Sequence, residues 1–189
     1  MPSINFNFIQ NLLKDNKDLY PLFVETGTYL GETIRPMEPY FKNLYTIEIS
    51  PLLHEQAKNL YRGNKIKFLL GDSSVVLTSL ISELNDNTIF FLDGHWSSGI
   101  TGRGFKDCPL VEEINTIFEN FKHKAIIIVD DYSFFGKSPK TGNNENWEDI
   151  SKDILIQILS NRLIKTYHLP SELDPTDRLI FEIDSIKEK

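Results

Sequence analysis

Two short apolar segments, 89–92 and 125–129, are each followed at once by acidic side chains. The acidic residues are Asp93 after the first segment, and Asp130 and Asp131 after the second. If both segments are strands of one parallel sheet, their carboxyl ends share an edge, and the three carboxylates converge there. Two like charges about 4 Å apart repel by about 4 kcal/mol at an effective dielectric constant of about 20, so a proton or a cation must compensate. Oxygen ligands suit Mg²⁺, with Mn²⁺ or Ca²⁺ as alternatives, and we therefore predict a divalent metal site.

A histidine, His95, lies two residues beyond Asp93. Its imidazole, with an unperturbed pKa of about 6.5, is suited to taking a proton from a substrate near neutral pH. A cation at Asp93 would lower the pKa of a substrate hydroxyl group and fix its position, which makes His95 the candidate general base. The alternative is that His95 only packs on a bound ligand or caps its loop. The other histidines are expected on solvated helix or strand surfaces: His54, His123 and His168.

A glycine turn follows the first predicted strand, 22–25, and reads Glu25-Thr26-Gly27-Thr28-Tyr29-Leu30-Gly31-Glu32-Thr33. Such a turn lets the backbone approach a ligand bound beyond the carboxyl ends of the strands. The turn argues against NAD, because Tyr29 takes the place of the middle glycine in G-x-G-x-x-G. Glu48 ends the second predicted strand 23 residues after Glu25. A carboxylate at an offset of about 20 residues is typical of one that binds a ribose diol.

The turn resembles the first motif of the metal-dependent O-methyltransferases, of the catechol and caffeoyl-CoA type and of the macrocin type that methylates sugars. That motif, E-x-G-x-Y/F-x-G-x-S/T, is matched in order by Glu25, Gly27, Tyr29, Gly31 and Thr33. The resemblance covers about residues 20–135. It implies a class I methyltransferase fold and S-adenosylmethionine as the cofactor.

The resemblance also implies roles for single residues. Glu25 and the backbone around Gly27 would hold the methionine end of the cofactor, with Thr33 reaching its carboxylate, and Glu48 would hold the ribose. The turn 71–73 after the third strand would face the adenine. The full set of cofactor-binding candidates is Glu25, Gly27, Thr28, Tyr29, Gly31, Thr33, Glu48, Gly71, Asp72, Ser73 and Asp93.

The same families place one Asp after the fourth strand and an acidic pair after the fifth, so Asp93, Asp130 and Asp131 would hold the metal. The sequence departs from the catechol type after Asp93, because Gly94 intervenes before the His-Trp pair and no catalytic Lys follows closely. The catalytic candidates are therefore Asp93 and His95.

Each of these residues also has an ordinary structural explanation. Gly27 and Gly31 fit tight turns, Glu48 fits a solvated strand end, Asp72 fits a helix cap and Asp131 fits a turn after a strand. The cofactor-binding interpretation is favoured because the candidates all follow the carboxyl ends of the predicted strands.

Short apolar segments alternate with stretches of helical periodicity, which is typical of a parallel sheet between helices. The predicted strands are 22–25, 44–48, 66–70, 89–92, 125–129, 163–168 and 179–183. The predicted helices are about 4–15, 31–40, 51–61, 73–84, 109–121 and 147–161. Periodicity indicates one α/β domain over residues 1–189, with an N-terminal helix within 1–20. With the resemblance, the expected fold is a Rossmann-like, mostly parallel seven-stranded sheet with a C-terminal antiparallel hairpin and helices on both faces.

Composition limits the partners. A net charge of −7 opposes binding to nucleic acid or anionic lipid, and no apolar run approaches the roughly 20 residues of a membrane span. A single cysteine and a polar N-terminal segment without signal-peptide features favour a cytoplasmic location.

The function that the resemblance implies is transfer of a methyl group from S-adenosylmethionine to a hydroxyl group of a small molecule or glycan, assisted by Mg²⁺ or another divalent cation. Two alternatives remain, a non-catalytic cofactor-binding protein of the same fold and a metal-dependent hydrolase or hydroxylase-like enzyme. The sugar-modifying families that the chain resembles usually carry extra N-terminal helices over the acceptor site, whereas here only about 20 residues precede the first predicted strand. The walls of the acceptor site must therefore come from the glycine-rich loop 94–107 and the polar loop 132–146, or from a second copy of the chain in a homodimer.

Overall fold

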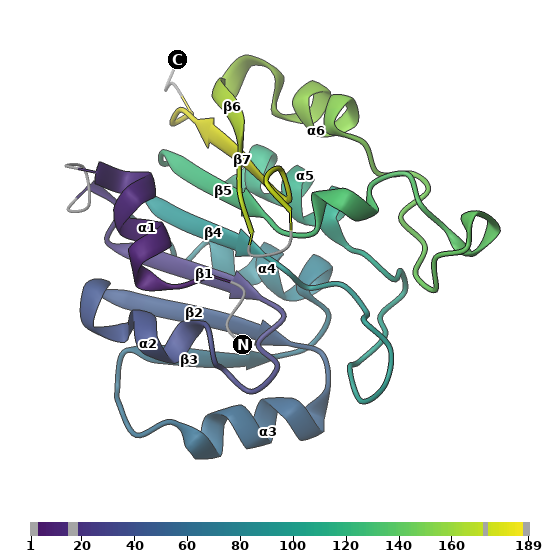
Figure 1. Ribbon diagram of the computed structural model, residues 1–189. Helices are drawn as coiled ribbons and strands as arrows, with labels where there is room; N and C mark the ends of the chain where they lie inside the picture. Colours follow the sequence, from purple (N-terminus) through teal and green to yellow (C-terminus); the bar gives the residue numbers. More distant parts are fainter. Residues whose placement is uncertain (1–3, 15–18, 172–173, 187–189) are drawn as a thin grey trace.

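The computed structural model describes residues 4–14, 19–171 and 174–186 (Figure 1). Its strands are β1 (Leu22–Thr26), β2 (Asn43–Glu48), β3 (Ile66–Leu70), β4 (Thr88–Leu92), β5 (Ala125–Val129), β6 (Leu163–Leu169) and β7 (Arg178–Ile183). They form one sheet in the order β3-β2-β1-β4-β5-β7-β6. Strands β1 to β5 pair in parallel, whereas β7 is antiparallel to both β5 and β6. The predicted mostly parallel seven-stranded sheet with an antiparallel C-terminal hairpin is confirmed.

The helices are α1 (Phe6–Leu13), α2 (Ile34–Met37), α3 (Pro51–Leu60), α4 (Ser73–Ile81), α5 (Leu110–Asn120) and α6 (Lys152–Leu159). Helices α4, α5 and α6 pack on one face of the sheet, and α1 and α2 pack on the other (Figure 1). Side chains alternate between these two cores along each strand: in β4, Phe90 joins the first core and Phe91 the second. Because β1, β4 and β5 are buried on both faces, every residue in them is buried.

Two predicted helices differ from the structure. The helix expected at 31–40 is a single turn, α2, followed by a 3-10 turn over Glu38–Tyr40. Pro39 has no amide hydrogen to donate to the preceding turn, so a regular α-helix cannot continue through it. The last helix begins at Lys152 and not at 147, because Ser151 caps it by accepting a hydrogen bond from the amide of Ile154 at 3.3 Å.

No helix in the described part of the chain is both long and apolar enough to span a membrane.

Candidate functional site

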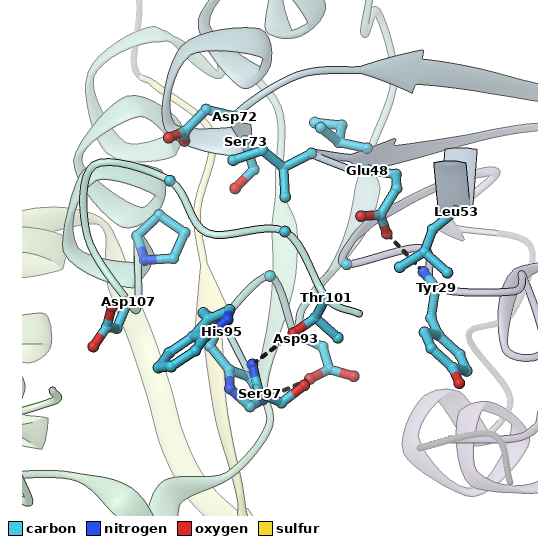
Figure 2. A pocket seen from close by; sticks show the side chains of 18 of the residues that line it. Tyr29, Glu48, Leu53, Asp72, Ser73, Asp93, His95, Ser97, Thr101 and Asp107 are labelled. Atoms are coloured by element: carbon cyan, nitrogen blue, oxygen red, sulfur yellow. Dashed lines mark hydrogen bonds and ion pairs between the residues drawn. The ribbon is translucent and has the colours of Figure 1, made fainter. Parts of the chain in front are cut away.

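A hollow lies at the carboxyl ends of β1 to β4 (Figure 2). The predicted site residues among those lining it are Gly27, Tyr29, Glu48, Gly71, Asp72, Ser73, Asp93 and His95. They come from the segments that follow four different strands. The parallel register of these strands brings their ends to one edge of the sheet, as the sequence predicted.

The turn after β1 depends on glycine at position 27. Gly27 has φ of +82°, and its amide donates to the carbonyl oxygen of Ile47 at 2.9 Å. A Cβ atom at this position would overlap the carbonyl oxygen of Asp93. Glycine therefore allows the turn after β1 to lie directly against the end of β4, where the acidic cluster begins.

The carboxylate of Glu48 is buried and bonded to two backbone amides. Its Oε2 accepts from the amide of Tyr29 at 2.8 Å (Figure 2), and its Oε1 accepts from the amide of Ser50 at 2.9 Å. Burial raises the pKa of Glu48, while these amide hydrogen bonds act in the opposite direction. Each carboxylate oxygen keeps capacity for a further hydrogen bond, so Glu48 is placed to accept from hydroxyl groups of a ligand in the hollow.

Asp72 combines a structural role with a position in the hollow. Its Oδ1 caps α4 by accepting from the amide of Ser74 at 3.0 Å and from the Ser74 hydroxyl at 2.6 Å. The other oxygen lies beside Gly104, where a Cβ atom would overlap it. A Cβ atom at Gly102 would likewise overlap the side chain of Ile49. The loop 94–107 therefore lies close against the ends of β2 and β3 and forms a wall of the hollow.

Four predicted cofactor residues are not among those lining the hollow: Glu25, Thr28, Gly31 and Thr33. Glu25 is buried, and its Oε2 accepts from the hydroxyl of Thr46 at 2.6 Å. The Thr46 hydroxyl lies 2.5 Å from that of Thr28. Burial raises the pKa of Glu25 well above its ordinary value. This chain of polar groups lies behind the glycine turn and links it to β2.

The acidic cluster at the ends of β4 and β5 encloses His95. The Nε2 atom lies 2.9 Å from Asp131 Oδ2 and 3.5 Å from Asp93 Oδ1. Asp93, His95 and Asp131 each offer one possible metal-ligand atom, and these three atoms lie within 4.8 Å of one another. Burial lowers the pKa of His95, but hydrogen bonds to surrounding carboxylates outweigh it and hold the pKa well above its ordinary value. Two carboxylates and an imidazole form a donor set that suits a divalent cation such as Mg²⁺ or Mn²⁺.

The neighbouring residues Asp130 and Asp131 have different partners. Asp131 has φ of +58°, so the backbone turns sharply after β5. Asp130 is buried and pairs with Arg178, whose Nε lies 3.4 Å from Asp130 Oδ1. Burial and the charges of Asp93 and Asp131 raise the pKa of Asp130, against the opposing effect of Arg178. Asp131 thus joins the cluster around His95, while Asp130 is bound to a cation from β7.

Two site residues were missed by the sequence analysis, Arg178 and Glu145. Glu145 Oε2 lies 2.9 Å from His95 Nδ1 and accepts from Trp147 Nε1 at 2.9 Å. The only signal in the sequence was that Glu145 falls within the polar loop 132–146. Nothing in the spacing of 50 residues connects it to His95.

Cationic side chains in the two long loops mostly pair with carboxylates nearby in the sequence. The pairs are Arg103 with Asp107, Lys106 with Glu112, and Lys140 with Glu148. These cations are therefore engaged with carboxylates close to them in the sequence. They tie the loops to themselves or to the segments that follow, and these three side chains do not form a surface of free positive charge.

Glu113 on α5 is a buried carboxyl group beside the site, and its ionisation is expected to limit stability. Burial raises its pKa from 4.5 to about 7. Oε1 has no hydrogen-bond partner among the described residues. A pKa raised by folding means that the native state binds the proton more tightly. This contribution to the free energy of unfolding is complete below pH 4.5 and is lost as pH rises through about 7.

Replacing Glu113 with glutamine changes the free energy of unfolding, and this change should be more stabilising at pH 8 than at pH 4.5. The upper limit of this difference is about 3 kcal/mol, since one pKa unit corresponds to about 1.4 kcal/mol. Urea unfolding at the two pH values measures it. Glu119→Gln, at an exposed position of the same helix, is the matched control. A difference equal to that of the control would contradict the prediction.

Comparison with known proteins finds similar structures but no similar sequences. No protein-family model matches the sequence, and no curated protein is significantly similar to it. A Staphylococcus aureus protein assigned as a caffeoyl-CoA O-methyltransferase is similar with a TM-score of 0.62 and 15% identity, covering 95% of this chain and 82% of the other. An S-adenosylmethionine-dependent methyltransferase from Clostridium acetobutylicum is similar with a TM-score of 0.56 and 14% identity, covering 95% and 89%.

A third similar structure is the N-methyltransferase NodS from Bradyrhizobium japonicum in complex with S-adenosylhomocysteine. Its TM-score is 0.55 at 12% identity, and the match covers 96% of this chain and 85% of the other. These similar proteins are named for different acceptor atoms, so the comparison does not choose between oxygen and nitrogen as the acceptor. The sheet order, the antiparallel β7 and these similarities together show that the chain has the Rossmann-like class I methyltransferase fold.

Proposed function

We propose that this chain is an S-adenosylmethionine-dependent methyltransferase that acts on a hydroxyl group of a small molecule or glycan with the help of a divalent cation. The observation that carries the proposal is the contact between two sites. The glycine turn at Gly27 lies directly against Asp93, which belongs to the cluster with His95 and Asp131. A cofactor in the hollow and a cation at the cluster would therefore be neighbours.

The hollow offers groups for each part of the proposed cofactor. Glu48 would accept hydrogen bonds from the ribose hydroxyls, and Asp72 with Ser73 would face the adenine. The methionine end would lie against the backbone turn at Gly27, which the buried Glu25 supports through Thr46. Within this proposal, Glu25 does not touch the cofactor but holds the backbone turn that does.

The cluster supplies what a hydroxyl acceptor needs. When bound by Asp93 and Asp131, the cation would acidify the acceptor hydroxyl and offset the negative charge that raises the pKa of His95. His95 Nε2 would then accept the hydroxyl proton. The acceptor oxygen takes the methyl group as the carbon–sulfur bond breaks, which leaves S-adenosylhomocysteine. Asp93 would orient both the cation and the acceptor, because it lines the hollow and its Oδ1 lies 3.5 Å from His95 Nε2.

Calorimetry with the wild-type chain tests the cofactor assignment. S-adenosylhomocysteine should bind at least about tenfold more tightly than adenosine, because the turn at Gly27 adds charge-assisted hydrogen bonds to its amino-acid end, each worth about 1.5–3 kcal/mol. NAD⁺ is the control ligand and should bind more weakly than either. Equal affinities for S-adenosylhomocysteine and adenosine, or tighter binding of NAD⁺, would contradict the assignment.

A further inference from the structure

His95 is bonded through both ring nitrogens, and the second bond comes from a distant loop. Its Nε2 faces Asp131 and Asp93, while its Nδ1 lies 2.9 Å from Oε2 of Glu145. Glu145 is 8% exposed and the His95 side chain 11%. Water therefore competes weakly for this hydrogen bond, which makes it stronger than a bond at the surface.

The loop that carries Glu145 is itself fixed on the protein. Trp147 Nε1 donates to the same Oε2 atom at 2.9 Å, and the Trp147 ring lies 5.1 Å from the His95 ring. The amide of Trp147 donates to the carbonyl oxygen of Lys137 at 2.8 Å. The amide of Asn146 donates to Asp107 Oδ2 at 3.0 Å, which ties this loop to the glycine-rich one. Glu145 therefore has a defined position before any ligand binds.

We infer that Glu145 is the positioning residue for His95. By accepting the Nδ1 hydrogen, it fixes the ring orientation and the tautomer in which Nε2 faces Asp93 and Asp131. Both ring nitrogens face a carboxylate at 2.9 Å, but Asp131 would be taken up by the cation, whereas Glu145 would not. With the cation bound, a neutral imidazole would therefore keep its hydrogen on Nδ1 and its lone pair on Nε2. The inference rests on the proposed function for its consequence, which is that Nε2 faces the acceptor hydroxyl beside the cation.

The test compares ring ¹⁵N spectra of histidine-labelled full-length protein with Mg²⁺ present. In the wild-type chain, the His95 signals should show a hydrogen retained on Nδ1, and a His95→Gln variant assigns them. In Glu145→Ala, the Nδ1 hydrogen should exchange and the Nε2-protonated tautomer should appear. Mn²⁺ affinity, measured by the loss of free-ion electron paramagnetic resonance signal, should fall several-fold, because a hydrogen on Nε2 would bond to Asp131 and compete with the ion for that carboxylate.

Two further variants make the result specific. Glu145→Gln keeps an oxygen acceptor of the same reach, so it should restore the wild-type tautomer and recover part of the Mn²⁺ affinity. Glu148→Ala removes the same charge from an exposed site three residues further along the chain and should change neither readout. If Glu145→Ala fails to fold, Glu145→Gln decides the question, because loss of the charge should still weaken Mn²⁺ binding several-fold.

The inference is overturned if the His95 signals and Mn²⁺ affinity of the folded Glu145 variants equal those of the wild type. Failure of the proposed function gives a different pattern. A wild-type chain that binds no Mn²⁺ would contradict the proposed metal site, while the effect of Glu145→Ala on the His95 tautomer would still decide the role of Glu145.

Discussion

Replacing Asp131 with alanine should weaken Mn²⁺ binding by about 100-fold or more. Asp131 and Asp93 each place a carboxylate oxygen near the ring of His95, and the ligand atoms of the three residues all lie within 4.8 Å of one another. An opposite unit charge about 4 Å away contributes about 4 kcal/mol at an effective dielectric constant of about 20, which is a factor of about 1000 before solvent and neighbouring groups compensate. Mn²⁺ serves as the probe, because its free ion is measured directly by electron paramagnetic resonance during a titration.

The control for charge is Asp149→Ala, which removes one carboxylate from an exposed position in the polar loop region and should leave Mn²⁺ affinity within about twofold. Asp130→Ala is the more informative comparison. Asp130 is bound to Arg178, so its removal should weaken Mn²⁺ binding by much less than removal of Asp131. Equal losses at Asp130 and Asp131 would contradict the assignment of Asp131 as the direct ligand, and unchanged affinity in Asp131→Ala would eliminate the proposed metal site.

The contrast between these two neighbours shows what a sequence pattern can predict. Strand periodicity placed both aspartates at the carboxyl end of β5, because apolar residues buried on both faces of a sheet form a recognisable run. Periodicity does not determine which of the two aspartates points toward the cluster around His95. That depends on the left-handed backbone at Asp131 and on Arg178, which arrives from an antiparallel strand 47 residues later.

The polar loop before α6 was the least predictable part of the candidate site. The segment from Trp147 onward has apolar residues at helical spacing, which led to a predicted helix starting there. In the structure Trp147 is buried beside His95, with rings of Phe134 and Phe135 packed against it. Tertiary burial of one large side chain thus outweighs a local helical preference. The position of Glu145 follows from this packing, and no local rule predicts it.

Replacing Glu48 with alanine should weaken S-adenosylhomocysteine binding by about 100-fold. Two hydroxyl groups bonded to one buried carboxylate are expected to contribute about 1.5–3 kcal/mol each, and part of this is lost again to desolvation. The change also removes the acceptor for the amides of Tyr29 and Ser50. Calorimetric titration measures the affinity. Glu55→Ala, on the exposed face of α3, is the matched control and should bind as the wild type does.

Adenosine separates the two ways in which Glu48→Ala weakens binding. If Glu48 acts on the ribose, adenosine and S-adenosylhomocysteine lose affinity by the same factor, because both contain the diol. If the variant instead loosens the turn at Tyr29, S-adenosylhomocysteine loses more, because its amino-acid end is the part that the turn would hold. Equal losses are expected, since the Gly27 amide remains bonded to Ile47 without Glu48. Unchanged affinity for both ligands would remove Glu48 from the proposed cofactor site.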